Sequence, residues 1–228
     1  MTAKSTREHL IDVGLGLMHQ NGYKATGLTD ILEAADVPKG SFYHHFVNKE
    51  DFAAAALERY GMREREHAAS VLTDTSTPPL KRLRRYFSDL VKLYGQKGAI
   101  PGCMLGRFGL EIAAESPQLR NRISASFGHW QQTIAAVVAQ AVVQKELPAS
   151  TDAESLAGFL LNSWEGALLR SQVDKSNVPL ELFVSTVFNG ILTREFKGNA
   201  AIQRQRRDRK DNIKAIELKR FENRRIYA

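Results

Sequence analysis

Apolar residues recur at helical spacing along almost the whole body of this 228-residue chain. One such stripe is formed by Leu83, Phe87, Leu90 and Tyr94, which are three or four residues apart and would share one face of a helix. Signals for strands are nearly absent, because no sustained two-residue alternation occurs and no Asn-Gly or Asp-Gly turn joins two β-branched runs. The pattern therefore predicts an all-α fold of about nine helices with short connections.

The net charge is confined to one end of the chain. The sequence has 32 Lys and Arg against 25 Asp and Glu, a net charge of +7. Residues 197–228 hold 11 of the basic residues and four of the acidic ones, so this segment carries the whole excess and residues 1–196 are neutral. The basic isoelectric point is consequently weak support for a DNA-binding face on the body of the protein.

Composition also limits where the protein is expected to work. Cys103 is the only cysteine, so no disulfide can form within the chain, and a reducing compartment such as the cytoplasm fits best. No run of about 18 apolar residues is present, and the first residues lack the apolar stretch of a secretory signal. We therefore expect a cytoplasmic protein that does not enter a membrane.

Residues 22–50 carry the most informative pattern. Two short helices are predicted at residues 28–35 and 39–46, separated by the tight break Asp36-Val37-Pro38 and followed by a longer helix that Asn48 would cap. This is the spacing of a helix-turn-helix, whose second helix enters the major groove of DNA. Residue types alone leave a second interpretation open, in which the segment is only a helical hairpin with a polar surface.

The run from Thr26 to Asp51 resembles the DNA-binding signature of TetR-family regulators. The resemblance rests on a match without gaps at Thr26, Ile31, Ala35, Val37, Gly40, Phe42, Tyr43, His45, Phe46, Lys49 and Glu50. The chain departs from the signature at two positions, since Leu32 replaces a usual Ala and Asp36 replaces the usual turn Gly. Asp tolerates a left-handed backbone better than most residues, so we expect the turn to survive.

The resemblance implies a division of the chain and a set of DNA contacts. It implies a helix-turn-helix domain at residues 1–50, a helical effector-binding and dimerisation domain at 51–196, and a basic extension at 197–228. It also implies a homodimer that binds a palindromic operator in double-stranded DNA. Thr29, Lys39, Gly40 and His45 match positions that face bases, and Thr26, Ser41, Tyr43, His44 and Lys49 match positions near phosphates.

A narrower resemblance concerns Cys103. The segment 98–105 is similar to the start of the sixth helix in the branch of the family that senses electrophiles and oxidants, which includes repressors of N-ethylmaleimide reductase and of acrylate metabolism. A cysteine at a helix N-terminus is near unpaired N–H groups that stabilise a thiolate, which agrees with a reactive site. The alternative is an inert buried thiol. Gln172 stands where part of that branch has a lysine, so a cysteine–lysine reaction is not expected.

The remaining residues suggest a small-molecule effector rather than catalysis. Phe108, Trp130, Phe159 and Trp164 are candidates for the lining of an effector cavity, although aromatic residues at helical spacing also form ordinary cores. No histidine, cysteine or acid pattern predicts a metal or another cofactor, and no nucleophile–base set is recognisable. We therefore expect a regulator of the repressor type that is not an enzyme. The alternative is a helical small-molecule-binding protein or enzyme without a recognisable catalytic set.

Two further expectations concern assembly and the basic segment. The helices around 153–172 and 179–194 carry apolar residues on more than one face, for example Leu161, Leu169, Phe188 and Leu192, so they are expected to pair with a second copy. The basic segment 197–228 is either a solvated extension or an arm that binds phosphates without regard to sequence.

Overall fold

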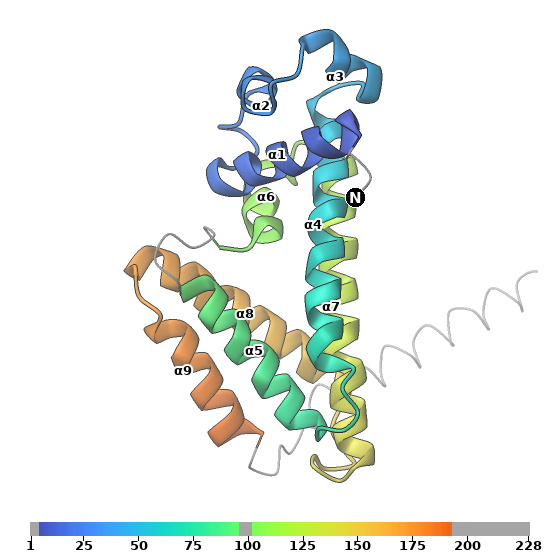
Figure 1. Ribbon diagram of the computed structural model, residues 1–228. Helices are drawn as coiled ribbons and strands as arrows, with labels where there is room; N and C mark the ends of the chain where they lie inside the picture. The colour runs from blue at the N-terminus through green and yellow to red at the C-terminus, as the bar shows by residue number, and fades with distance from the viewer. Residues whose placement is uncertain (1–4, 96–101, 193–228) are drawn as a thin grey trace, which may run out of the picture.

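The computed structural model describes residues 5–95 and 102–192, and within these ranges all regular structure is helical (Figure 1). The helices are α1 Thr6–Asn21, α2 Leu28–Ala35, α3 Lys39–His45, α4 Lys49–Leu72, α5 Pro79–Gly95, α6 Met104–Ile112, α7 Pro117–Val143, α8 Ala153–Asp174 and α9 Val178–Thr186, followed by the π-helix η1 Val187–Ile191. The prediction of an all-α chain with about nine helices is confirmed.

The helices form a small group at one end of a larger one. Helices α1, α2 and α3 lie together at one end, and the long helices α4 and α7 run side by side away from them (Figure 1). Helices α5, α8 and α9 pack at the other end, and α6 lies between the two groups, next to α1 (Figure 1). Helix α4 begins in the first group and ends in the second, so one rigid element joins them.

Local sequence signals explain several of the helix ends. The Ser5 side chain accepts a hydrogen bond from the N–H of Glu8 at the start of α1, and Asn48 does the same for the N–H of Asp51 at the start of α4. Helix α1 ends at Gly22, whose φ of 93° favours glycine. The predicted cap at Asn48 is therefore confirmed.

Each group of helices has its own aromatic centre. In the first group the rings of Phe42, Phe46 and Phe52 pack with centroids 5.0–5.5 Å apart. In the second, Trp164 from α8 packs against Phe87 from α5 and Phe183 from α9, at 5.4 and 5.5 Å. Burial of such large apolar side chains is the main favourable term in folding, so these clusters fix how the helices meet.

The structure corrects part of the expected pairing surface. Leu161, Phe188 and Leu192 are buried inside the subunit, so they are not available for a second copy. Leu169 is exposed, and it shares this exposure with Phe159 and Val173 on α8 and with Val178 and Leu182 on α9. An apolar surface on these two helices therefore remains, although it is made of different residues from most of those predicted.

Two other expectations concern residues that the structure does not describe. The basic segment 197–228 lies outside the described residues, as do Ile100 and Pro101 before Cys103. Within the described ranges, none of the helices combines the length and the apolar character needed to cross a membrane.

Candidate nucleic-acid interface and effector region

The turn between α2 and α3 has the geometry of a helix-turn-helix. Asp36 adopts the left-handed conformation, with φ 51° and ψ 47°, and the N–H of Val37 donates to the carbonyl of Leu32 at 3.1 Å. Pro38 then caps α3, where its missing N–H costs nothing because no helical hydrogen bond is required there. Asp36 thus takes the place of the glycine in the signature, as predicted.

Helix α3 is anchored by one face and open on the other. Phe42 is completely buried between Phe46 and Phe52, which holds the helix against the start of α4. Lys39, Gly40, Tyr43 and His44 lie on the outside of the same helix, and Tyr43 is 52% exposed. A helix of 7 residues with one buried anchor therefore presents a polar, basic and aromatic face to solvent.

The structure sorts the nine predicted DNA contacts by exposure. Those that are exposed are Thr29, Lys39, Gly40, Tyr43 and His44, while Ser41, His45 and Lys49 are half-buried and Thr26 is buried. A Cβ atom added at Gly40 would meet nothing within 4 Å, so no packing inside the protein requires a glycine at this position. That freedom agrees with the prediction that Gly40 permits close approach of a partner from outside.

Two of the nine residues donate side-chain hydrogen bonds to main-chain carbonyls inside the protein. The Thr26 hydroxyl is buried and donates to the carbonyl of Gly22 at 2.7 Å, so the expectation that it lies near phosphates is corrected for this side chain. Lys49 donates to the carbonyl of Tyr23 at 2.6 Å and lies over the Tyr23 ring, 4.4 Å from its centroid. Both side chains hold the 22–27 loop in place, and the ammonium group of Lys49 keeps further N–H donors that a phosphate can accept.

Helix α6 connects α1, α2 and α3, which we call the DNA-facing helices because they carry most of the predicted DNA contacts, to the rest of the molecule. The Arg107 guanidinium donates to the carbonyls of Gln20 and Asn21 at 2.8 Å each, at the negative C-terminal end of α1. His19 from α1 donates through Nε2 to the carbonyl of Gly102 at 2.7 Å. The first turn of α6 is therefore bonded directly to the end of α1. The role of Arg107 as a contact between α6 and α1 could not be predicted from the sequence, because it depends on two segments more than 80 residues apart.

Cys103 caps the start of α6, as the sequence predicts, but its thiol is buried. Only 6% of the residue is exposed, and the Tyr60 hydroxyl lies 3.9 Å from Sγ. Burial raises the pKa of the Cys103 thiol, and the Glu165 carboxyl raises it further, while the N–H groups of Gly106 and Leu105 act in the opposite direction. The expected stabilisation of a thiolate is therefore corrected, since burial outweighs the helix N-terminus in this conformation.

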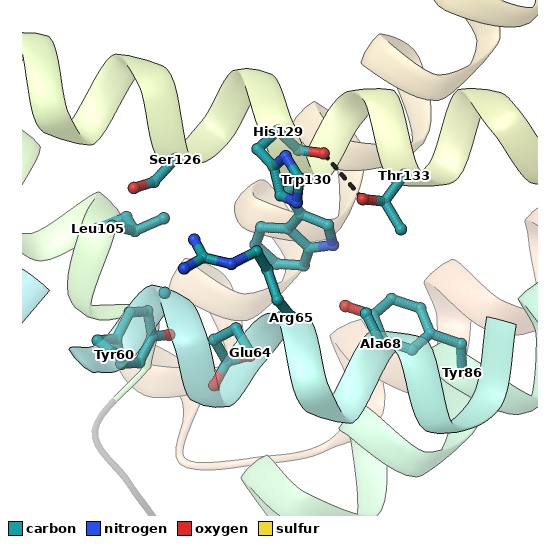
Figure 2. A pocket seen from close by; sticks show the side chains of 11 residues that line it. Tyr60, Glu64, Arg65, Ala68, Tyr86, Leu105, Ser126, His129, Trp130 and Thr133 are labelled. Carbon is teal, nitrogen blue, oxygen red and sulfur yellow. Dashed lines mark hydrogen bonds between the residues drawn. The ribbon is translucent and has the colours of Figure 1, made fainter. Parts of the chain in front are cut away.

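Two hollows lie on either side of the first turn of α6. One is a cavity between α4, α5, α6 and α7, with Tyr60, Glu64, Tyr86 and Trp130 among its lining (Figure 2). The other is a wider open groove between α6, α7 and α8, which includes Cys103 and Glu165. We call these the aromatic cavity and the Cys103 groove. Glu64 and Glu165 could not be singled out from the sequence, because each lies in an ordinary charged run or helix and only the packing of other helices buries it.

Of the four aromatic residues predicted to line an effector cavity, only Trp130 lines one of these two hollows. Trp164 and Phe108 are fully buried and belong to the core, where Phe108 packs against Tyr23 at 5.7 Å. Phe159 is 44% exposed on α8. The prediction is therefore wrong for Phe108 and Trp164, because helical spacing does not distinguish a core face from a cavity wall, and for Phe159 it stays a prediction.

The described residues offer no obvious place for a metal. Within residues 5–95 and 102–192 there is no group of three or more His, Cys, Asp or Glu side chains that could hold an ion. The titratable groups that gather around the start of α6 are instead carboxyls, phenols and one thiol, and burial is the largest cause of their raised pKa values.

Comparison with known proteins identifies both parts of the chain. Residues 10–56 match the model of bacterial regulatory proteins of the tetR family, and residues 79–187 match the tetracyclin repressor-like C-terminal domain. The chain is 32% identical to the HTH-type transcriptional repressor DhaR of Mycobacterium sp. (strain GP1), an alignment covering 84% of this chain and 95% of DhaR. It is 34% identical to the transcriptional regulator AcuR of Cereibacter sphaeroides, over 84% of this chain and 88% of AcuR.

A solved structure agrees with these sequence matches. The crystal structure of the reduced form of Escherichia coli NemR superposes with a TM-score of 0.76 at 29% sequence identity, covering 81% of this chain and 95% of the NemR chain. The match extends over the DNA-facing helices and the larger helical group together. The chain therefore belongs to the TetR family of transcriptional regulators.

Proposed function

We propose that the protein is a transcriptional repressor that binds a palindromic operator as a homodimer and leaves it when an effector acts on the larger helical domain. The observation that carries this function is helix α3, which the buried Phe42 anchors while Lys39, Gly40, Tyr43 and His44 lie exposed. A lysine at the N-terminal end of such a helix can donate to guanine edges in the major groove, and the aromatic and histidine side chains can reach phosphates. Since its partner is DNA, we place the protein in the cytoplasm, and we assign it no catalytic role.

The DNA-binding proposal is tested with the DNA upstream of the protein's own gene, because such regulators often control adjacent genes. A gel-shift titration should give binding to one short segment that survives excess random DNA, whereas equal displacement by any DNA would contradict it. Specific binding of this kind typically exceeds non-specific binding by a factor of about 10³ or more.

The dimer is proposed to form through the exposed apolar side chains of α8 and α9. Phe159, Leu169 and Val173 on α8 and Val178 and Leu182 on α9 are exposed in the single subunit, with fractions between 44% and 73%. A closed two-fold contact between these helices would bury them and fix the spacing of the two α3 helices. Sedimentation at micromolar concentration should give a dimer for the wild type and a monomer for Leu169→Glu combined with Leu182→Glu, and a wild-type monomer would contradict the assignment.

Effector release is proposed to pass through the first turn of α6. This turn contacts both hollows and is bonded to the end of α1 by Arg107 and His19. A ligand, or a group attached to Cys103, would shift the turn and move α1 with its neighbours, so that the two α3 helices no longer match the operator. The proposal includes both a non-covalent ligand and an electrophile or oxidant as effector.

Substitution of Cys103 distinguishes an effector that modifies the thiol from one that binds without a covalent bond. Treatment with an electrophile such as N-ethylmaleimide should lower operator affinity in the wild type, and Cys103→Ser should bind the operator but lose that response. Because burial raises the pKa of this thiol, we expect its alkylation to be slower than that of the unfolded chain. If Cys103→Ser responds like the wild type, the covalent route is excluded and a non-covalent ligand remains.

A further inference from the structure

Of the two hollows beside the first turn of α6, only the Cys103 groove has room for an organic molecule. The aromatic cavity leaves a space of about 30 Å³, which is enough for about one or two water molecules. The Cys103 groove leaves about 920 Å³, which lies within the range of small-molecule sites in proteins. A ligand of the larger helical domain would therefore enter the groove between α6, α7 and α8.

The lining of the groove combines apolar side chains with one carboxyl group. Phe127 on α7 and Leu161 and Leu168 on α8 contribute to the lining, as does Leu110 on α6, which is 84% exposed. Glu165 on α8 is the only acidic side chain among the described residues of the lining. Small-molecule sites typically have this composition, in which apolar walls cover the body of the ligand and a few polar groups orient it.

The carboxyl group of Glu165 lacks a strong hydrogen-bond donor. Its Oε1 atom is buried and has no hydrogen-bond partner among the residues that the structure describes. Burial and the nearby Glu64 carboxyl raise the pKa of Glu165 from 4.5 to about 7, and the Cys103 thiol, a weak donor, acts in the opposite direction. A buried oxygen without a donor is costly, so a ligand that supplies a donor gains the energy of an unmade hydrogen bond.

Arg107, the only basic side chain among the described residues of the lining, directs its charge away from this carboxyl. Its Nε donates to Oε1 of Glu111 at 3.1 Å, and its Nη1 and Nη2 donate to the carbonyls of Gln20 and Asn21 at 2.8 Å each. All three nitrogens of the guanidinium are therefore engaged at the end of α1 and with Glu111. When Glu165 is ionised its charge is not compensated inside the groove, which favours a cationic ligand and disfavours an anionic one.

Two glycines keep the space around Glu165 open. A Cβ atom at Gly106 would lie 3.0 Å from Oε2 of Glu165, so the glycine lets the carboxyl lie close against the first turn of α6. A Cβ atom at Gly128 would meet nothing within 4 Å, although glycine is a poor helix former and this position lies inside α7. Packing inside the subunit therefore does not require Gly128, and the space in front of it belongs to the groove.

We propose that the Cys103 groove binds an organic cation that carries N–H donors on an apolar body, with the charged group paired to the Glu165 carboxylate and the body against Phe127 and Leu168. This inference rests on the proposed function in one respect, since it names the chemical class of the non-covalent effector. A planar amidinium suits the site, because it donates two parallel N–H bonds to one carboxylate. The pair would form beside the first turn of α6, which Arg107 bonds to α1.

The first test compares three molecules of nearly the same shape and different charge. Naphthalene-2-carboxamidine, naphthalene-2-carboxamide and naphthalene-2-carboxylate are titrated into the full-length protein by calorimetry. The amidine should bind at least about tenfold more tightly than the amide, because hydrogen bonds between charged groups are about twice as strong as neutral ones, and the carboxylate should bind most weakly. Equal binding of the three molecules, or binding of none, would overturn the proposal.

The second test removes the charge of Glu165 and keeps the shape of its side chain. Glu165→Gln should lower the affinity for the amidine about tenfold and leave that for the amide nearly unchanged. Glu154→Gln is the matched control, because Glu154 is exposed near the start of the same helix and does not line the groove. Circular dichroism checks that both variants fold. A folded Glu165→Gln protein that still prefers the amidine would exclude Glu165 as its partner.

The third test fills the groove without touching a charged group. Gly128→Leu places a side chain in the open space in front of α7, so it should abolish binding of both the amidine and the amide. Gly16→Leu is the control, because a Cβ atom there also meets nothing within 4 Å but the residue lies on α1, outside the groove. If a folded Gly128→Leu protein binds the amidine like the wild type, the ligand site is not the Cys103 groove.

Operator binding separates this inference from the proposed function. If the amidine binds through Glu165 but leaves operator affinity unchanged, the site is supported and its role as effector site is lost. If the protein binds its operator but none of the three molecules, the inference fails and the DNA-binding function stands. Loss of operator affinity in the wild type but not in Glu165→Gln, at the same concentration of amidine, would support both.

Discussion

The DNA-facing helices and the larger helical domain differ in the exposure of their polar side chains. In α3, Lys39, Tyr43 and His44 lie in solvent while a single aromatic side chain, Phe42, is buried. Around the start of α6, Glu64, Glu165 and the Cys103 thiol are all mostly buried, and burial raises the pKa of each. A surface that reads DNA needs charges that are already exposed, whereas a site that responds to an effector gains sensitivity from groups whose charge is unfavourable until a ligand arrives.

The largest expected effect tests the anchor of the DNA-facing region. Phe42→Ala removes a completely buried ring, so it should destabilise this group of helices by about 3–5 kcal/mol and abolish operator binding. Val143→Ala is the control, because Val143 is 81% exposed at the end of α7. Chemical denaturation followed by circular dichroism measures the difference. If Phe42→Ala costs no more than Val143→Ala, the fixed position of α3 does not depend on this anchor.

The next effect tests the buried carboxyls of the larger domain. The pKa of Glu165 is raised from 4.5 to about 7, chiefly by burial, so the folded protein binds this proton more tightly than the unfolded chain. Its contribution therefore favours folding below about pH 4.5 and is lost as pH rises through about 7, a change of at most about 3 kcal/mol. Glu165→Gln should consequently be more stable than the wild type at pH 8 and little different at pH 5.

The melting temperature as a function of pH measures this effect, with Glu66→Gln as the exposed control. If Glu165→Gln and Glu66→Gln shift the melting temperature equally at pH 8, Glu165 does not carry a buried charge. The contrast between the two regions would then lose one of its three supporting groups.

The two regions also differ in how well the sequence predicts them. The helix-turn-helix is local, because its caps, its turn at Asp36 and its anchor Phe42 lie within about 30 consecutive residues, and each residue type has a direct structural meaning. The main error in the predicted helix-turn-helix concerned Thr26, whose hydroxyl donates to the carbonyl of Gly22 inside the protein instead of facing outward. Exposure of a single polar residue cannot be deduced from helical spacing alone.

The effector region depends on contacts between distant segments. Glu64 and Glu165 are about a hundred residues apart, and each is buried only because α5, α6 and α7 pack around them. Trp164 and Phe108 have the spacing of cavity residues but lie in the core, while Tyr60 and Tyr86 line the cavity without having been singled out. Helical periodicity identifies which face is apolar, and it does not say whether that face meets another helix or an empty space.

A third prediction concerns the lysines at the two ends of the DNA-facing region. Lys39 is exposed and makes no ion pair or hydrogen bond through its side chain with the residues that the structure describes, so Lys39→Ala should weaken operator binding by about 1–3 kcal/mol and affect random DNA much less. Lys49 donates a hydrogen bond to the carbonyl of Tyr23, so Lys49→Ala should lower the stability of the protein. It should also weaken binding to operator DNA and to random DNA by the same factor. Fluorescence anisotropy with operator and scrambled DNA measures both. Equal loss on the two DNAs for Lys39→Ala would remove it from base recognition.

The smallest effect is expected when either of two glycines, at positions where packing inside the protein does not require a glycine, is replaced by alanine. A Cβ atom at Gly40 in α3 or at Gly16 in α1 would meet nothing within 4 Å, and neither residue has a positive φ. Replacing either by Ala should therefore stabilise its helix by about 0.5–1 kcal/mol, since glycine is the poorer helix former. The two variants should differ only on DNA. If α3 lies close against the groove, the added methyl of Gly40→Ala reduces operator affinity while Gly16→Ala leaves it unchanged, and anisotropy titrations at one salt concentration compare them. Equal operator affinities for the two folded variants would place the backbone of Gly40 away from the DNA.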